Sequence, residues 1–75
     1  MEFTYDKNIR KNGETLRGIS MYDIIDQNGK TIPISFARSL DYVDAKMTID
    51  WINEGNSKPY GMSEILNYIN KEVTN

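Results

Sequence analysis

Cysteine and histidine are both absent from this sequence. Without cysteine, the chain forms no disulfide and offers no thiolate as a nucleophile or metal ligand. Without histidine, it lacks the commonest general base and the commonest transition-metal ligand. No serine stands in a G-x-S-x-G or S-x-x-K pattern, and no glycine-rich phosphate-binding motif occurs. We therefore expect a protein that is not an enzyme, with no catalytic residues, no metal site and no cofactor.

Long apolar runs and an excess of basic charge are also lacking. No stretch approaches the roughly 18 apolar residues that span a membrane, and the polar, acidic start of the chain is not typical of a secretory signal. The formal net charge is −2, whereas a domain dedicated to nucleic acid is usually basic. The composition favours a cytoplasmic protein without a membrane segment and disfavours nucleic acid as its partner.

The 75 residues suffice for one small α+β domain, residues 1–75, with a single core. A chain of this length buries only about 60% of the surface that its unfolded form exposes. Domains of this size often gain stability from disulfides, metals or association. The composition provides neither disulfides nor the usual metal ligands. Association with a partner or with a second copy is therefore the remaining source of extra stability.

Two Asn-Gly pairs, Asn12-Gly13 and Asn28-Gly29, divide the first half of the chain. Asn-Gly tolerates the positive φ that a type I′ turn requires at both central positions, and this turn joins paired strands. The pattern predicts two hairpins that form a three-stranded antiparallel meander. Because Pro33 has no N–H, we expect the third strand at the sheet edge. The strands are expected at about residues 2–11, 14–25 and 30–36.

The two predicted hairpins place their apolar residues on opposite faces of the sheet. The second hairpin gives the clearer alternation, and we expect its set to face the core. That set is Ile19, Met21, Ile25, Ile32, Ile34 and Phe36. The simplest register of the first hairpin gathers a different set on the other face. That set is Phe3, Tyr5, Ile9, Leu16, Tyr22 and Ile24. Either a bulge near Gly18 returns Phe3 and Tyr5 to the core, or the outer face is unusually apolar.

Two helices are predicted after the sheet, so the expected order is βββαα with one helix packed on the sheet. Ser39 is a good N-cap for the first, which runs to about Glu54 and ends at Gly55. The second helix is expected at about residues 63–72. Its apolar positions form one stripe. The stripe consists of Met62, Ile65, Leu66, Ile69 and Val73.

The first predicted helix carries two opposed apolar stripes, which indicates two apolar neighbours. One stripe contains Leu40, Val43, Met47 and Trp51, and the other contains Tyr42, Ala45, Ile49 and Ile52. The sheet covers one of them. The second helix covers the other, or that stripe is left as a docking surface, and both alternatives stay open.

The chain is rich in aromatic residues, with five Tyr, two Phe and one Trp. Tyrosine is favoured at interfaces because its ring buries area while its hydroxyl finds a partner. The start of the first predicted helix is also acidic. We therefore expect the residues that bind a protein partner to include Phe3, Tyr5, Tyr22, Tyr60, Asp41 and Asp44.

Four basic residues, Lys7, Arg10, Lys11 and Arg17, surround the first predicted hairpin tip. Basic side chains on a hairpin are able to meet phosphates. In its coarse βββα order the chain is similar to the arm-binding domains of integrases and to related plant transcription-factor domains, and this likeness implies nucleic-acid binding. Edge-strand lysines that discourage aggregation explain the same residues.

Three functions follow from these observations. The first is a protein-binding module, which needs only a stable scaffold and an apolar surface that carries tyrosine. In size, acidity and lack of motifs the chain resembles the small accessory proteins of bacteriophages and mobile elements, which implies an inhibitor that binds a host protein. The second is a nucleic-acid-binding module that uses the basic hairpin. The third is a self-associating structural unit, such as a homodimer.

Overall fold

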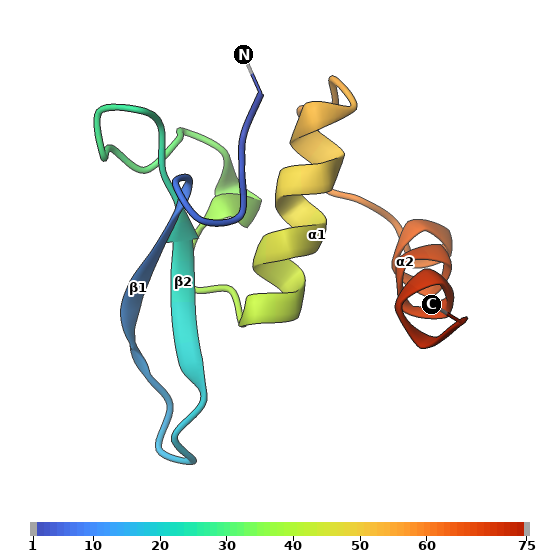
Figure 1. The fold of residues 1–75 in the computed structure, drawn as a ribbon, viewed down its shortest axis with the longest axis horizontal. Coiled ribbons are helices and arrows are strands. Elements are labelled where there is room, and N and C mark those ends of the chain that lie inside the picture. The colour runs from blue at the N-terminus through green and yellow to red at the C-terminus, as the bar shows by residue number, and fades with distance from the viewer. Residues whose placement is uncertain (1, 75) are drawn as a thin grey trace.

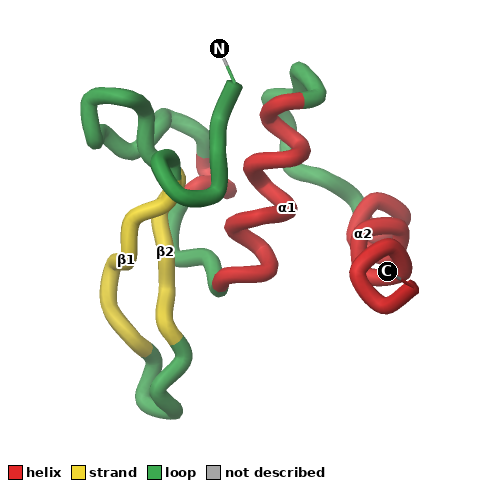
Figure 2. Tube along the Cα trace, viewed as in Figure 1, coloured by secondary structure: helices red, strands yellow, loops and turns green. Residues whose placement is uncertain are grey.

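The computed structural model describes the backbone of residues 2–74 and the side chains of residues 2–71. It is an α+β fold in which a two-stranded antiparallel sheet precedes two helices (Figures 1 and 2). Helix α1 contacts β2, and α2 stands on the far side of α1 from the sheet (Figure 1). The elements are β1 (Ile9–Glu14), β2 (Ser20–Ile24), the short 3-10 helix η1 (Ser35–Ala37), α1 (Tyr42–Asn53) and α2 (Met62–Thr74). The predicted fold class and the two helices are confirmed, and the third strand is wrong.

The first Asn-Gly pair forms a bulge inside β1 rather than a turn. Lys11 lies opposite Tyr22 and Glu14 lies opposite Ser20, so β1 advances three residues while β2 advances two. Gly13 has a φ of 101°, which a residue with a side chain rarely adopts. The positive φ that suits Asn-Gly to a turn suits it equally to a bulge, and the predicted turn at this position is wrong.

The turn of this hairpin lies further along the chain, over residues 15–19. The Thr15 N–H donates to the Ile19 carbonyl at 2.9 Å, and the Gly18 N–H donates to the Thr15 carbonyl at 3.0 Å. The Thr15 hydroxyl also accepts the Ile19 N–H at 3.1 Å. These bonds hold a tip on which Leu16 is fully exposed.

The second Asn-Gly pair does form a turn. The carboxylate of Asp26 accepts the N–H groups of Asn28 at 2.8 Å and Lys30 at 3.0 Å. The φ of Gly29 is positive and that of Asn28 is not, so the turn is not type I′. Across the turn, Ile25 pairs with Thr31 in a single isolated bridge, whereas a two-residue turn at Asn28-Gly29 would place Ile25 opposite Ile32.

The third strand fails because the chain leaves the sheet at Pro33. The Ile34 N–H donates back to the Ile32 carbonyl at 2.8 Å, a tight turn that directs the chain into η1. The free edge of β2 is completed instead by Leu40, whose N–H and carbonyl exchange bonds of 2.8 and 2.6 Å with Tyr22. Two separate bridges therefore take the place of the third strand.

The core lies between β2, the loop after it and α1. Its fully enclosed part is Ile24, Ile32, Ala37, Ala45 and Ile49. Partly buried residues packed around it are Phe3, Ile9, Tyr22, Ile34, Leu40 and Ile52. The face that carries Ile9, Tyr22 and Ile24 is therefore the inner one, whereas the sequence pattern placed it outside. Of the residues that the pattern assigned to the core, Ile32 and Ile34 belong to it and Ile19 is exposed.

Helix α1 begins two residues later than predicted. Asp41 is its N-cap, and the Asp41 carboxylate accepts the N–H of Asp44 at 2.8 Å. Ser39, the predicted cap, has a φ of 55° and donates its N–H to the buried carboxylate of Asp23 at 2.9 Å. The predicted stop is confirmed, since Gly55 has a φ of 90° and donates its N–H to the Ile52 carbonyl.

Within residues 2–74, no helix combines the length and the apolar content that a membrane crossing requires.

The burial pattern predicts where a truncation destabilises the fold. Ile49 has an exposed fraction of 0%, and Ile49→Ala should lower the free energy of unfolding by about 2–5 kcal/mol because it leaves a cavity. The matched control is Leu16→Ala, which should change that free energy by less than about 0.5 kcal/mol. Urea denaturation followed by circular dichroism measures both, and equal losses would contradict the assigned core.

Candidate protein-binding site

Helix α2 exposes most of its apolar stripe, of which Ile65 is half-buried. The exposed fractions of Met62, Leu66 and Ile69 are 68%, 52% and 45%; Val73 lies outside the described side chains. An amphipathic helix of a globular protein normally places this stripe on the core. In the described part of the chain, α2 packs extensively on no other element. We call Met62, Leu66 and Ile69 the α2 apolar face.

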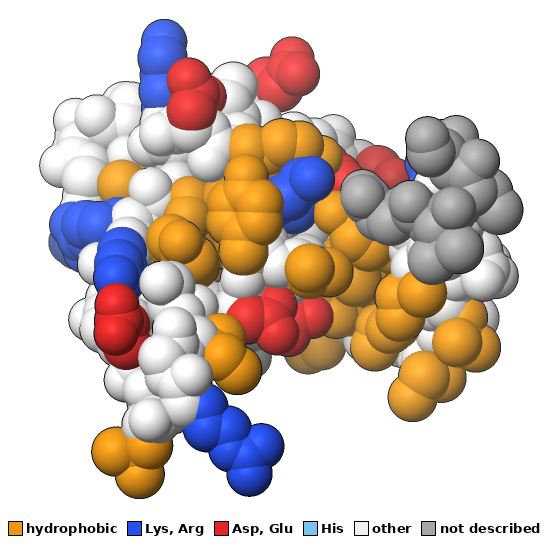
Figure 3. All heavy atoms as spheres, turned by 60° about the horizontal axis from the view of Figure 1, so that its bottom comes forward, with side chains coloured by type: hydrophobic (Ala, Val, Ile, Leu, Met, Phe, Trp, Pro, Cys, Tyr) orange, Lys and Arg blue, Asp and Glu red, His pale blue; other side chains and the backbone are white. Residues whose placement is uncertain are grey.

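More exposed apolar residues stand at the start of α1. Tyr42 and Val43, in its first turn, are both about half exposed. Figure 3 shows hydrophobic side chains spread across one side of the molecule, from its middle to the end near the grey atoms. Large exposed apolar surfaces on a small protein typically mark interaction sites. The predicted α1 stripe that contains Val43 and Met47 is therefore only partly covered. Met47 is buried, whereas Val43 is exposed.

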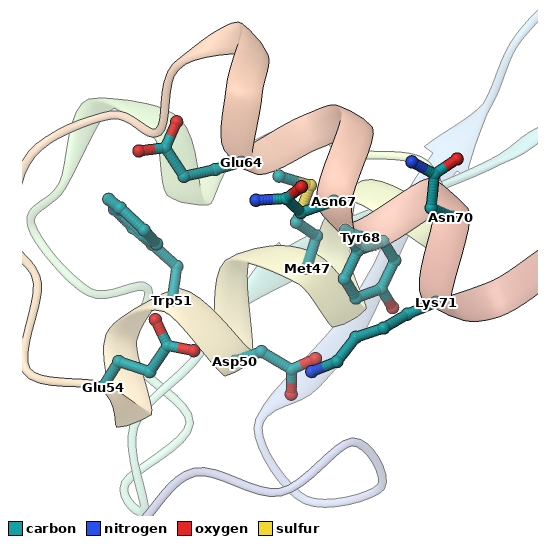
Figure 4. Close-up of a pocket in the computed structure, with 9 residues that line it drawn as sticks. All are labelled: Met47, Asp50, Trp51, Glu54, Glu64, Asn67, Tyr68, Asn70 and Lys71. Carbon is teal, nitrogen blue, oxygen red and sulfur yellow. The ribbon is translucent and has the colours of Figure 1, made fainter.

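The polar side of α2 faces a groove between the two helices. The groove has a volume of about 600 Å³. Figure 4 shows the side chains that converge on it from both helices. The lining residues from α1 and its C-cap are Met47, Asp50, Trp51 and Glu54, and those from α2 are Glu64, Asn67, Tyr68, Asn70 and Lys71. Aromatic rings and carboxylates therefore share one concave surface.

Trp51 is held in place within this groove. Its indole N–H donates to the Lys58 carbonyl at 2.6 Å. The ring of Tyr60 meets the indole edge-on, with centroids 6.1 Å apart, and meets Phe36 in the same way at 6.0 Å. The Tyr60 hydroxyl lies 3.3 Å from that of the fully buried Thr48. The connector between the helices is thus fastened to α1 through aromatic side chains.

The carboxylate of Glu64 is fixed beside the groove. Three groups donate hydrogen bonds to this carboxylate: the backbone N–H of Glu64 itself, the Ser63 hydroxyl and the Gly61 N–H. These bonds hold the pKa of Glu64 below its usual value. The Ser63 and Gly61 bonds measure 3.0 and 3.1 Å. Glu64 therefore keeps its negative charge at neutral pH.

Two of the predicted partner-binding residues lie near a tyrosine cluster. Tyr22 is half-buried against the core and meets Tyr42 edge-on, with centroids 5.8 Å apart. Tyr5 is more exposed, and its hydroxyl donates to the carboxylate of Asp50. The Lys46 ammonium lies 5.2 Å from the Tyr5 ring centre and 5.7 Å from that of Tyr42. These tyrosines form part of the surface, but Tyr22 also supports the core.

Of the other four predicted partner-binding residues, Phe3, Tyr60 and Asp41 have structural roles, and the side chain of Asp44 is exposed. Phe3 packs against the core, and its N–H and carbonyl bond the Asn53 side chain at 2.8 and 2.9 Å. Tyr60 is wedged between two rings, as described above. Asp41 caps α1, and burial together with the Asp41 charge raises the pKa of Asp44. The structure does not gather the six predicted residues into one surface.

The predicted basic residues are strung along the hairpin rather than clustered. Arg10 donates to the Gly29 carbonyl at 2.7 Å, and Lys11 forms an ion pair of 2.7 Å with Glu14. This pair raises the pKa of Lys11 and lowers that of Glu14. Lys7 and Arg17 are exposed at opposite ends of the hairpin. Two of the four cations therefore already have partners within the chain.

The sequence reasoning missed the α2 apolar face and the groove as sites. The stripe of α2 was visible in the sequence, but periodicity says nothing about which side of a helix meets its neighbour.

Among the described residues, no group of three acidic, His or Cys side chains is placed to hold a metal ion. Comparison with protein-family models, with curated proteins and with solved structures found no match to this chain.

The two tyrosines of the predicted surface should respond unequally to truncation. Tyr22→Ala should lower the free energy of unfolding by about 2–3 kcal/mol because its ring covers the core. Tyr5→Ala should cost less than about 1 kcal/mol, since it loses an exposed ring, one hydrogen bond and one cation–π contact. Thermal and urea unfolding measure the difference, and a larger loss at Tyr5 would show that the core is assigned wrongly.

Proposed function

We propose that this protein is a non-enzymatic protein-binding module that docks another protein on the α2 apolar face. The observation that carries the proposal is the exposure of Met62, Leu66 and Ile69 on a helix whose polar side faces its own chain. Covering such a stripe removes apolar surface from water, which is the main driving force of association. Amphipathic helices bind grooves of partner proteins through residues at this spacing.

The finer proposal is that the partner is a host protein whose site is blocked by this binding. It is supported by the small size, the acidic balance and the likeness in these respects to the accessory proteins of bacteriophages and mobile elements. An inhibitor of this kind needs a rigid scaffold and one adhesive surface. The short core and the α2 apolar face supply these two parts.

Self-association is the second candidate, because the same face is available to a second copy. A stable protein interface usually buries about 800 Å² on each partner, and three exposed side chains on one helix fall short of that area. A homodimer would therefore need further surface, such as the exposed Tyr42 and Val43 of α1. We therefore favour a different protein, because a groove shaped for α2 covers more of this helix than a second copy of the same face does.

Nucleic-acid binding has less support. Contacts with several phosphates need several cations that point away from the protein, and the side chains of Arg10 and Lys11 have partners within the hairpin. If binding does occur, its affinity must fall steeply as the salt concentration rises. A filter-binding assay at about 50 mM salt, where phosphate contacts are strong, tests this function directly.

The protein-binding function is tested by two substitutions on α2. Leu66→Gln and Ile69→Gln together keep good helix formers and replace two of the three residues of the α2 apolar face with polar side chains. We expect the doubly substituted protein to stay folded and to bind its protein partner at least about tenfold more weakly, as the loss of buried anchor residues implies. The partner is captured from the native host on immobilised protein, purified and titrated by calorimetry.

The control is Leu16→Gln, which makes the same change at the exposed tip of the hairpin and should leave the affinity intact. Light scattering over a series of concentrations decides between a foreign partner and a second copy. A concentration-dependent dimer that Leu66→Gln abolishes would replace the proposed partner with a second copy. Equal binding by the α2 variant and the control would overturn the role of the α2 apolar face.

A further inference from the structure

We propose that the groove between α1 and α2 is a second binding site, which receives an arginine side chain from a basic segment of a partner protein. This inference goes beyond the proposed function, because the groove is lined by the polar side of α2 and the α2 apolar face lies on the other side of that helix. The argument comes from the aromatic lining, the charge and the size of the groove.

The aromatic lining suits a flat cation. Trp51 contributes its indole and Tyr68 its phenol ring to the same groove (Figure 4). A guanidinium stacks on such rings, since their faces are negative and the cation is planar and weakly hydrated. The bond to the Lys58 carbonyl and the edge contact with Tyr60 already hold the indole in place. Little side-chain freedom is therefore lost when a ligand arrives.

The charge of the groove also selects a cation. Three carboxylates, those of Asp50, Glu54 and Glu64, line it together with one ammonium, that of Lys71. Figure 4 shows Lys71 extended toward Asp50, while Glu54 and Glu64 lie at the opposite end, near Trp51. A net negative charge thus remains beside the indole, where a stacked guanidinium would sit. Carboxylates pair with guanidinium in a bidentate geometry that an ammonium does not match.

The size of the groove fits a side chain with part of its backbone. Its volume of about 600 Å³ falls within the range of sites that hold small ligands, about 300–1,000 Å³. The groove is open along both helices, so a peptide reaches it without a change in the fold. A neutral side chain of the same shape would fill the space and keep its hydrogen bonds to the carboxylates, but it would lose the ionic and cation–π contributions.

Trp51 is the single tryptophan of the chain, so its fluorescence and its indole N–H resonance report on the groove directly. The probe is acetyl-Gly-Arg-Gly-amide, titrated into the intact protein. Its matched control is the same peptide with citrulline, which keeps the shape of arginine and removes the charge. We expect a saturable shift of the Trp51 signals with the arginine peptide, a weaker response to a lysine peptide and the weakest response to the citrulline peptide.

Glu54→Gln should weaken binding of the arginine peptide about two- to fivefold, as the loss of one exposed ionic contact implies. The control Glu14→Gln changes the net charge equally on the distant hairpin and should leave the affinity unchanged. The Leu66→Gln, Ile69→Gln protein should bind the peptide like the unsubstituted protein, so failure here and failure of the proposed function are distinguishable. Equal responses to arginine and citrulline, or equal effects of the two Glu→Gln changes, would overturn the inference.

Discussion

The pairing of Tyr22 with Leu40 is the contact on which the rest of the fold depends. It returns the chain to β2 after the loop that holds η1, through two backbone bonds of 2.6 and 2.8 Å. The carboxylate of Asp23, the next residue on β2, supports both sides of this closure, since it accepts bonds from Ser39 and from Asn12 in the bulge of β1. Because α1 starts directly after Leu40, the bridge also determines where the helix meets the sheet.

The placement of α1 then divides the molecule into a side that holds the core and a side that lines the groove. Ala45 and Ile49 complete the core against Ile24, while Trp51 faces the groove and the connector. The chain after Gly55 is fastened to α1 through the Trp51 indole rather than through apolar packing of helix on helix. One helix therefore serves as a structural layer on one side and as a wall of the groove on the other.

Features with a local physical cause were predictable from the sequence, and features that depend on distant contacts were not. The helix stop at Gly55 and the turn at Asn28-Gly29 follow from the conformations those residues allow. The third strand was wrong because the chain leaves the sheet at Pro33, and Leu40, beyond the end of the predicted strand, takes the edge of β2. The inner and outer faces were exchanged because the core set was counted across a two-residue turn at Asn28-Gly29. The observed pairing of Ile25 with Thr31 shifts that register by one residue and puts Ile32 on the side of Ile24. The α2 stripe was predicted correctly, but its orientation depends on the connector path.

The fastening of the connector has a thermodynamic consequence for α2. Since α2 is held mainly through the connector, its local opening requires less free energy than the unfolding of α1 and the sheet, and its backbone amides should exchange with solvent sooner. A protein that covers Met62, Leu66 and Ile69 opposes this local opening, and it also stabilises the whole fold because the unfolded chain offers no such face. The affinity of such a complex thus includes the free-energy cost of ordering one helix. The rest of the chain is already ordered and adds no such cost.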